Sequence, residues 1–351
     1  MDLYINSVGV ISGAGNNMSG EFLLTKPDYS THVLSCVEPE YKEYIPVMQL
    51  RRMSKIVRRG VVAAKTAMQN AGIEKPDALS IGTAYGCLQD TESFLGKMIE
   101  QEEQMLTPTA FIQSTHNTVG GQIALLAGCN GHNLTYVHRG HSFEHAMINA
   151  ALYLGEHPGE NILVGGIDEL TENSIKALQI AGLITKEHLA TDDVINGSND
   201  ATVGGEGAAF FSVTQQPLSG RYIRIRALDI FKEYDEAAAL QKVKRFADNH
   251  KDIEIDLFLS GRNGDKKYLQ FYNSVRTEIY PLVADAQFKF CCGEYPVAGS
   301  FALAMLFECL EQKGCVPEFM ELAHPTGEIK NVVLVNNFGS YYSCWLLELA
   351  V

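Results

Sequence analysis

Short apolar segments rich in β-branched residues alternate along this chain with longer segments whose apolar residues recur every three or four positions. The first pattern predicts strands and the second predicts helices. In the first part of the chain, strands are predicted near residues 2–10, 79–85, 133–137, 161–166 and 207–214, and helices near 52–72, 89–104, 117–128, 142–155 and 171–181. In the second part, strands are predicted near 221–230, 253–259, 332–336 and 342–347, and helices near 233–249, 265–280 and 297–313. This alternation is typical of an α/β fold.

A polar, proline-containing turn at residues 215–220 separates the two parts. We therefore predict two similar halves rich in βαβ units, residues 1–215 and 216–351, of which the second is shortened. The similarity rests on the order of the elements, because the halves show no direct sequence repeat.

A strand-to-helix elbow is predicted at residues 138–142, whose sequence is His-Arg-Gly-His-Ser. The preceding residues 133–137 are β-branched and aromatic, and the apolar residues of 143–154 lie on one helical face. A helix that begins directly after a strand points its free N–H groups and its positive end at residue 141. This field would activate a thiol, but here it meets the imidazole of His141, whose cationic form it disfavours.

Composition and charge exclude several classes of protein. The longest apolar runs, such as 301–307, are far shorter than the roughly 20 residues that a membrane span needs, and no secretory signal is visible. The formal net charge of −14 argues against binding to nucleic acid or to anionic membranes. The eight cysteines show no paired metal-ligand spacing, which favours free, mostly buried thiols in a reducing cytoplasm.

One basic segment stands out against the acidic background. Five of its nine residues are cations: Arg51, Arg52, Lys55, Arg58 and Arg59. Helical spacing places most of these side chains on the outer side of the predicted helix, and the apolar residues Met53, Ile56, Val57 and Val61 on the inner side.

Six separated motifs resemble those of the β-ketoacyl synthases of the thiolase superfamily. They are the opening strand and glycine turn at 1–17, LRRMSK at 50–55, IGTAYG at 81–86, FIQSTHNTVGGQ at 111–122, GGEGA at 204–208 and NNFG at 336–339. The resemblance implies a thiolase-like α/β fold with α-β-α-β-α layers. It also implies that the elbow should carry a cysteine nucleophile, where this chain has His141.

The rest of the implied active site is altered as well. The resemblance calls for two histidines in the second half, but residues 251–323 contain none. A lysine is retained as Lys289, and the histidine expected five residues later is Glu294. After Phe338 and Gly339, tyrosines replace flexible glycines, which predicts a stiffer loop and a smaller pocket. His141, Lys289, Glu294 and Phe338 thus form a degenerate site without a confident catalytic residue.

The resemblance therefore favours a degenerate subunit similar to the chain-length-factor branch of the family. Such subunits lack the cysteine and partner an active ketosynthase in polyketide, aryl-polyene or fatty-acid-like biosynthesis. The implied partners are that ketosynthase and an acyl carrier protein, for which the five cations of 51–59 are the docking candidates. The isolated chain is expected to form a homodimer through strand 133–137, and no cofactor is implied. A solvated helix face is the equally weighted alternative for the five cations.

Two other functions stay open. His141, Lys289 and Glu294 could act on a thioester in acyl transfer or hydrolysis, or the chain could be a homodimer that binds acyl groups or carrier proteins. A histidine held by neighbouring backbone or by Glu144 is favoured over a catalytic His141.

Cys291 and Cys292 are expected to be buried rather than nucleophilic. His116 and His145 are single histidines without a visible third ligand, so no metal site is predicted.

Overall fold

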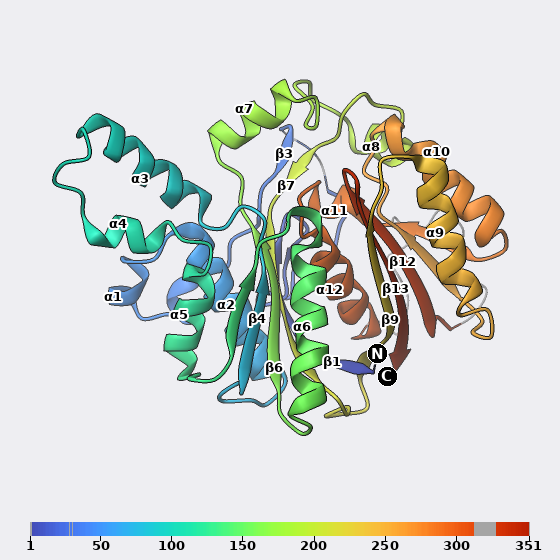
Figure 1. Ribbon diagram of the computed structural model, residues 1–351, viewed down its shortest axis with the longest axis horizontal. Helices are drawn as coiled ribbons and strands as arrows, with labels where there is room; N and C mark the ends of the chain where they lie inside the picture. The colour runs from blue at the N-terminus through green and yellow to red at the C-terminus, as the bar shows by residue number, and fades with distance from the viewer. Residues whose placement is uncertain (1, 28, 30, 312–327, 351) are drawn as a thin grey trace.

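The strands form two five-stranded units with the same topology in the computed structural model, which describes residues 2–27, 29, 31–311 and 328–350 (Figure 1). The first unit contains β1 (Leu3–Ser12), β4 (Ala78–Gly82), β5 (Asn133–Tyr136), β6 (Ile162–Asp168) and β8 (Gly207–Thr214), in the order β5-β4-β6-β8-β1. The second contains β9 (Tyr222–Lys232), β10 (Leu257–Ser260), β11 (Ala284–Gln287), β12 (Asn331–Phe338) and β13 (Tyr341–Ala350), in the order β11-β10-β12-β13-β9. In each unit the first three strands are parallel and the last two pair antiparallel.

The first residues of β1 join the two units. From Leu3 to Ile5, β1 pairs antiparallel with β9, so that the units make one mixed sheet of 11 strands, which includes the short β2 (Gly15–Asn16). Two further short strands, β3 (Val33–Leu34) and β7 (Gly204–Gly205), pair with each other in parallel.

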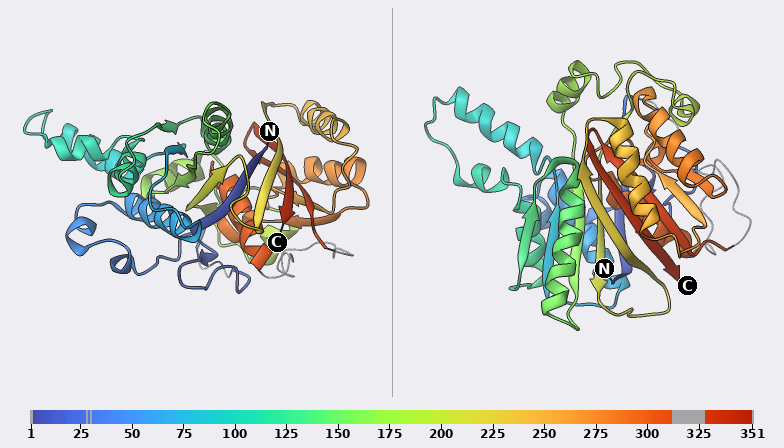
Figure 2. Two further views of the ribbon diagram at one scale, coloured as in Figure 1. Left: turned by 90° about the horizontal axis from the view of Figure 1, so that it is seen from below. Right: turned by 45° about the vertical axis from the view of Figure 1, so that its right-hand side comes forward.

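Three layers of helices alternate with the two strand units, which makes five layers in all (Figures 1 and 2). On the outer face of the first unit lie α2 (Lys55–Asn70) and α5 (Thr118–Ala127). Between the units lie α6 (Ser142–Glu156) and α12 (Ala298–Glu311). On the outer face of the second lie α9 (Glu236–Asp248) and α10 (Lys266–Ser274), the latter continued by a π-helical turn at Val275–Ile279. The predicted α-β-α-β-α thiolase-like fold is confirmed.

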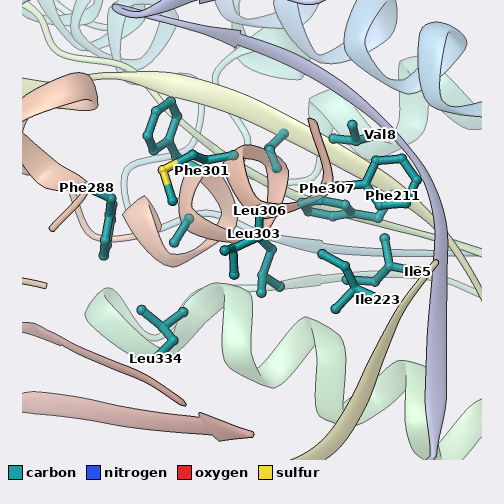
Figure 3. Close-up of a cluster of buried hydrophobic side chains, with 14 of the residues drawn as sticks. Ile5, Val8, Phe211, Ile223, Phe288, Phe301, Leu303, Leu306, Phe307 and Leu334 are labelled. Atoms are coloured by element: carbon teal, nitrogen blue, oxygen red, sulfur yellow. The ribbon is translucent and has the colours of Figure 1, made fainter. Parts of the chain in front are cut away.

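The middle layer explains the apolar run at 301–307. Phe301 to Phe307 are all buried, because α12 packs against strands of both units (Figure 3). A helix that is apolar all round must be buried on every side, and this one is. In β8, Phe211 packs into the same central cluster, whereas its neighbour Phe210 packs on the other side against the α2 layer, as a strand buried on both faces requires.

The remaining helices complete the described part of the fold. They are α1 (Val47–Leu50), α3 (Leu88–Glu100), α4 (Pro108–Gln113), α7 (Glu172–Ile180), α8 (Thr191–Asn196) and α11 (Lys289–Cys292), with 3-10 turns at Tyr41–Glu43 and Arg139–His141. Figure 1 shows α3 and α4 projecting from the first unit. None of the helices in the described part of the chain is long and apolar enough to cross a membrane.

Most of the predicted strands and helices form near the predicted positions. The exceptions include β11 and α11, which the apolar pattern missed, and the predicted helix 297–313, whose last two residues lie outside the described residues.

Candidate functional site

The predicted elbow lies between β5 and α6. Within this elbow, the backbone of Arg139 adopts a left-handed φ of 51°, two residues before His141. The hydroxyl of Ser142 accepts a hydrogen bond from the His138 N–H and donates one to the Arg139 carbonyl, both at 2.8 Å. These bonds hold a strained conformation that non-glycine residues rarely adopt.

His141 is buried behind the last hairpin of the sheet. Only 4% of the residue is exposed, and its Nε2 lies 2.9 Å from the Tyr342 carbonyl oxygen. Because a carbonyl only accepts, Nε2 carries the hydrogen in this bond. The ring packs edge-on against Tyr341, with 5.0 Å between ring centroids. Burial lowers the pKa of His141 to about 4, so the imidazole is neutral at neutral pH.

The β12–β13 hairpin also lies directly on the elbow. A β-carbon added to Gly140 would lie 2.8 Å from Cβ of Phe338 and 2.9 Å from Cβ of Tyr341. Only glycine therefore fits at position 140 without a shift of one of these elements. Phe338 and Tyr341 therefore lie directly against the backbone of the elbow, next to His141.

Lys289 and Glu294 form a buried ion pair next to the same hairpin. The ammonium of Lys289 lies 2.9 Å from both carboxylate oxygens of Glu294 and also donates to the Asn337 carbonyl. The side-chain amide of Asn263 donates to Glu294 at 2.6 Å. Since a lysine ammonium has three donors, these three contacts leave none for a ligand.

Phe338 connects the two parts of the degenerate site. It packs on Gly140 and also lines a cavity of about 60 Å³ together with Glu294, Tyr85 and Asn263. His141 and Lys289 each bond a backbone carbonyl of the β12–β13 hairpin. The structure thus arranges all four predicted site residues around one hairpin, in contacts that hold the fold together.

Two buried carboxyl groups lie near this region. Glu144 of α6 accepts a hydrogen bond from the Ser343 hydroxyl at 3.0 Å, and burial raises its pKa to about 7. Asp168 at the end of β6 accepts from the Thr83 hydroxyl and from the backbone N–H groups of Ala84 and Tyr85, and burial raises its pKa to about 7 too. Asp168 was not predicted as a site residue, although a polar residue at the end of a buried strand was a usable signal. Its contacts explain the IGTAYG motif structurally.

The five cations of residues 51–59 are divided between the surface and the core. The prediction that all five can dock a carrier protein is therefore wrong for one of them. Arg59 is fully buried and lies 2.6 Å from Glu38 and 2.6 Å from Glu206 of the GGEGA motif, so it cannot dock a partner. The reason is that the buried Glu206 requires a compensating cation. The inward positions Met53, Ile56, Val57 and Val61 are buried, as predicted.

The other four cations of the segment differ in exposure. Arg51 and Arg52 are exposed. Lys55 lies 3.6 Å from Glu38 and 3.5 Å from Glu206, and the half-buried Arg58 donates to the Leu50 carbonyl. Arg51 and Arg52 are therefore the cations most accessible to a partner.

Cys291 and Cys292 are fully buried in α11, and burial raises the pKa of both thiols well above the ordinary value. Neither can provide the thiolate that a nucleophile requires. Their expected burial is confirmed.

Three histidines, His138, His141 and His145, lie close together at the elbow. His138 Nδ1 lies 2.8 Å from His145 Nε2, and one nitrogen each from His138, His141 and His145 lies within 4.8 Å of the others. The interpretation of His145 as a single histidine is wrong, because the turn at 139–141 folds His138 back over the first turn of α6. The spacing of two and then three residues between the histidines was the signal in the sequence. His116 packs beside Gly86 instead.

Known proteins resemble this chain both in part of its sequence and in its fold. Residues 30–179 match the family model of the beta-ketoacyl synthase N-terminal domain. This part of the chain, less than half of its 351 residues, is therefore similar to the N-terminal domain of the beta-ketoacyl synthases. No curated protein sequence matches it. A beta-ketoacyl synthase from Burkholderia phymatum STM815 has a similar structure, with a TM-score of 0.78, 14% identity and 100% of both chains covered.

Two structures that contain chain length factors are also similar to this ketosynthase-like chain. The ishigamide ketosynthase/chain length factor gives a TM-score of 0.77 at 14% identity, with 99% of this chain and 98% of that chain covered. The ketosynthase ApeO in complex with its chain length factor ApeC from Xenorhabdus doucetiae gives 0.76 at 14% identity, with the same coverage. At these identities, the structural likeness establishes the fold.

Proposed function

We propose that this chain is a degenerate ketosynthase-like subunit of the chain-length-factor type, which works beside an active ketosynthase in polyketide, aryl-polyene or fatty-acid-like biosynthesis. The observation that carries the proposal is the filled elbow. His141 stands where a thiol is expected, and Phe338 and Tyr341 pack against Gly140 in front of it.

The chemistry of the surrounding groups supports the same proposal. Condensation needs a nucleophile for the acyl group and hydrogen-bond donors for the enolate. The seven cysteines in the described residues are all buried. The donors of Lys289 are taken by Glu294 and Asn337. Neither requirement is met by the groups around the elbow.

The edge of the first unit supports a partner subunit. Among the described strands β5 pairs only with β4, and it carries the half-exposed apolar residue Leu134, followed by Val137. An unpaired apolar edge invites pairing with another chain. In our proposal the partner continues the sheet at β5: the active ketosynthase in the cell, and a second copy when this chain is isolated. Arg51 and Arg52 then present the positive charge that an acidic carrier protein would bind.

The rival proposal, acyl transfer or hydrolysis by His141, receives less support. A catalytic base must reach the substrate proton, within hydrogen-bond distance or through one water. His141 is covered by Tyr341, and its Nε2 is engaged by the Tyr342 carbonyl.

The test is an elongation assay with acyl and malonyl carrier proteins. This chain alone should give no acyl-enzyme by intact-protein mass spectrometry and no malonyl-dependent product. Co-expressed with a ketosynthase encoded beside it, the chain should co-purify, and elongation should appear. An acyl group found on this chain, or condensation without a second subunit, would overturn the proposal.

A further inference from the structure

The three histidines of the elbow lie close enough to share one ligand. His138 precedes the 3-10 turn, His141 ends it, and His145 lies four residues later, one helical turn into α6. The Ser142 hydroxyl fixes the turn that brings the first of them back over the helix. The turn and the first residues of α6 therefore set the backbone positions of all three histidines.

The hydrogen bond of His141 leaves one ring nitrogen available as a ligand. Because Nε2–H donates to the Tyr342 carbonyl, Nδ1 of the neutral ring is unprotonated and carries a lone pair. A metal-bound histidine commonly donates its other N–H to a backbone carbonyl in this manner, which fixes both the tautomer and the ring orientation. His141 is thus already held as a ligand would be.

The contact between the other two histidines points to the same ligand. His138 Nδ1 and His145 Nε2 lie 2.8 Å apart, so one nitrogen must donate a proton to the lone pair of the other. A metal ion that replaced this proton would be bound by both nitrogens. At Zn–N distances of about 2.0–2.1 Å in a tetrahedral site, two nitrogens lie about 3.3–3.4 Å apart. The required widening is small, and the exposed His138 can move to provide it.

We propose that His138, His141 and His145 bind a divalent transition metal ion, zinc in the first instance, with the fourth position open to water. Neutral imidazole nitrogens suit zinc and cobalt, whereas magnesium and calcium prefer oxygen ligands. Three protein ligands and one open position are the pattern of an accessible zinc site, and the exposure of His138 gives the ion a path from solvent. This inference does not depend on the proposed partnership with a ketosynthase.

The experiment uses the full chain without a histidine tag, treated with a chelator and then titrated with Co²⁺. Binding should give the visible absorption bands of a four-coordinate cobalt ion, saturating at one Co²⁺ per chain, and Zn²⁺ should displace them. His138→Ala and His145→Ala should abolish the saturable signal. His157→Ala, which removes an exposed histidine from the other end of α6, should leave the titration unchanged.

Thermal unfolding supplies a second readout that guards against misfolded variants. Zn²⁺ should raise the Tm of the wild type and of His157→Ala, but not that of His138→Ala, since only an ion bound to the folded state stabilises it. His138 is exposed, so its alanine variant should retain the metal-free Tm of the wild type. Absent saturable Co²⁺ binding, or equal affinity in His138→Ala and His157→Ala, would reduce the cluster to a hydrogen-bonded histidine pair packed on Tyr341 and overturn the proposal.

Discussion

The edge strands β5 and β11 hold equivalent places in the two units but have opposite environments. All four residues of β11 are buried, and its Asp285 is paired with Arg262. No residue of β5 is fully buried. Leu134, within the strand, is 43% exposed, and Val137, directly after it, is 49% exposed. The chain therefore buries its second edge by itself and leaves the first one partly exposed.

The turns that follow these two strands differ in burial as well. After β11, Lys289 and Glu294 neutralise each other inside the protein. After β5, the elbow brings His138 to the surface, while His141 stays buried. The turn after β11 therefore stabilises the core, whereas the turn after β5 and its edge strand are where binding functions can reside.

Blocking the β5 edge should have the largest effect. Bonds to β4 run through the carbonyls of His132 and Tyr136, so the N–H of the intervening Thr135 points to the free edge. Thr135→Pro should remove one bond of a sheet that continues into a partner and yield monomeric or insoluble protein. Thr135→Val, which keeps the N–H, should remain a dimer. Sedimentation velocity measures both, and a well-behaved wild-type monomer at micromolar concentration would contradict the dimer and weaken the chain-length-factor proposal.

Removing a charge after β11 should be the next largest effect. Lys289→Ala leaves Glu294 buried without its cation and should lower the free energy of unfolding by about 3–5 kcal/mol. Lys330→Ala removes a cation from an exposed pair with Glu328 and should cost only about 0–1 kcal/mol. Urea denaturation compares them. Equal losses of unfolding free energy in the two variants would mean that the buried ion pair stabilises the fold no more than the exposed one does.

Glu144 provides a test by pH. Its folded-state pKa of about 7 lies above the ordinary 4.5, so its contribution to stability is complete below about pH 4.5 and is lost as the pH rises towards 7. His141 has the opposite sign, because its pKa falls from 6.5 to about 4 and its contribution is lost as the pH falls from 6.5 towards 4.

Glu144→Gln should remove only the first contribution. Relative to wild type, the variant should gain about 2 kcal/mol in unfolding free energy between pH 5 and pH 8. Glu156→Gln, at the exposed end of α6, is the matched control and should follow the wild-type profile. Parallel profiles for all three proteins would show that Glu144 titrates normally.

The smallest effect is expected from the surface charges of the first unit. Arg51→Glu with Arg52→Glu should weaken carrier-protein binding by about 1 kcal/mol at low salt and by less at physiological ionic strength, where charges are screened over about 8 Å. Lys244→Glu with Arg245→Glu makes the same charge change on α9 of the second unit and should leave binding unchanged. If both double variants bind alike, the first segment is a solvated helix face.

The repeated order of strands and helices was predictable because period-2 and period-3.6 patterns are local. β11 was missed because its sequence, Ala-Asp-Ala-Gln, has no β-branched residue, and burial rather than propensity makes it a strand. The division at residue 215 as a boundary of folding units stays a prediction.

The candidate site was less predictable, because its contacts join distant segments. The position of His141 at the elbow followed from the motif, but its partner, the Tyr342 carbonyl, lies 201 residues away. Arg59 looked like a surface cation because the pattern cannot reveal that Glu206 is buried beside it. The pairing of Lys289 with Glu294 was predictable, since the two are only five residues apart.

The central position of α6 and α12 has a consequence for how the chain folds. Each of these helices packs on strands of both units, so the main hydrophobic cluster draws residues from Leu3 to Leu349. A chain cut within residues 215–221 would leave each fragment with an uncovered apolar face. We expect neither fragment to fold alone and the two to recover the native structure only when mixed, so that synthesis of the first half must wait for the second before its core can close.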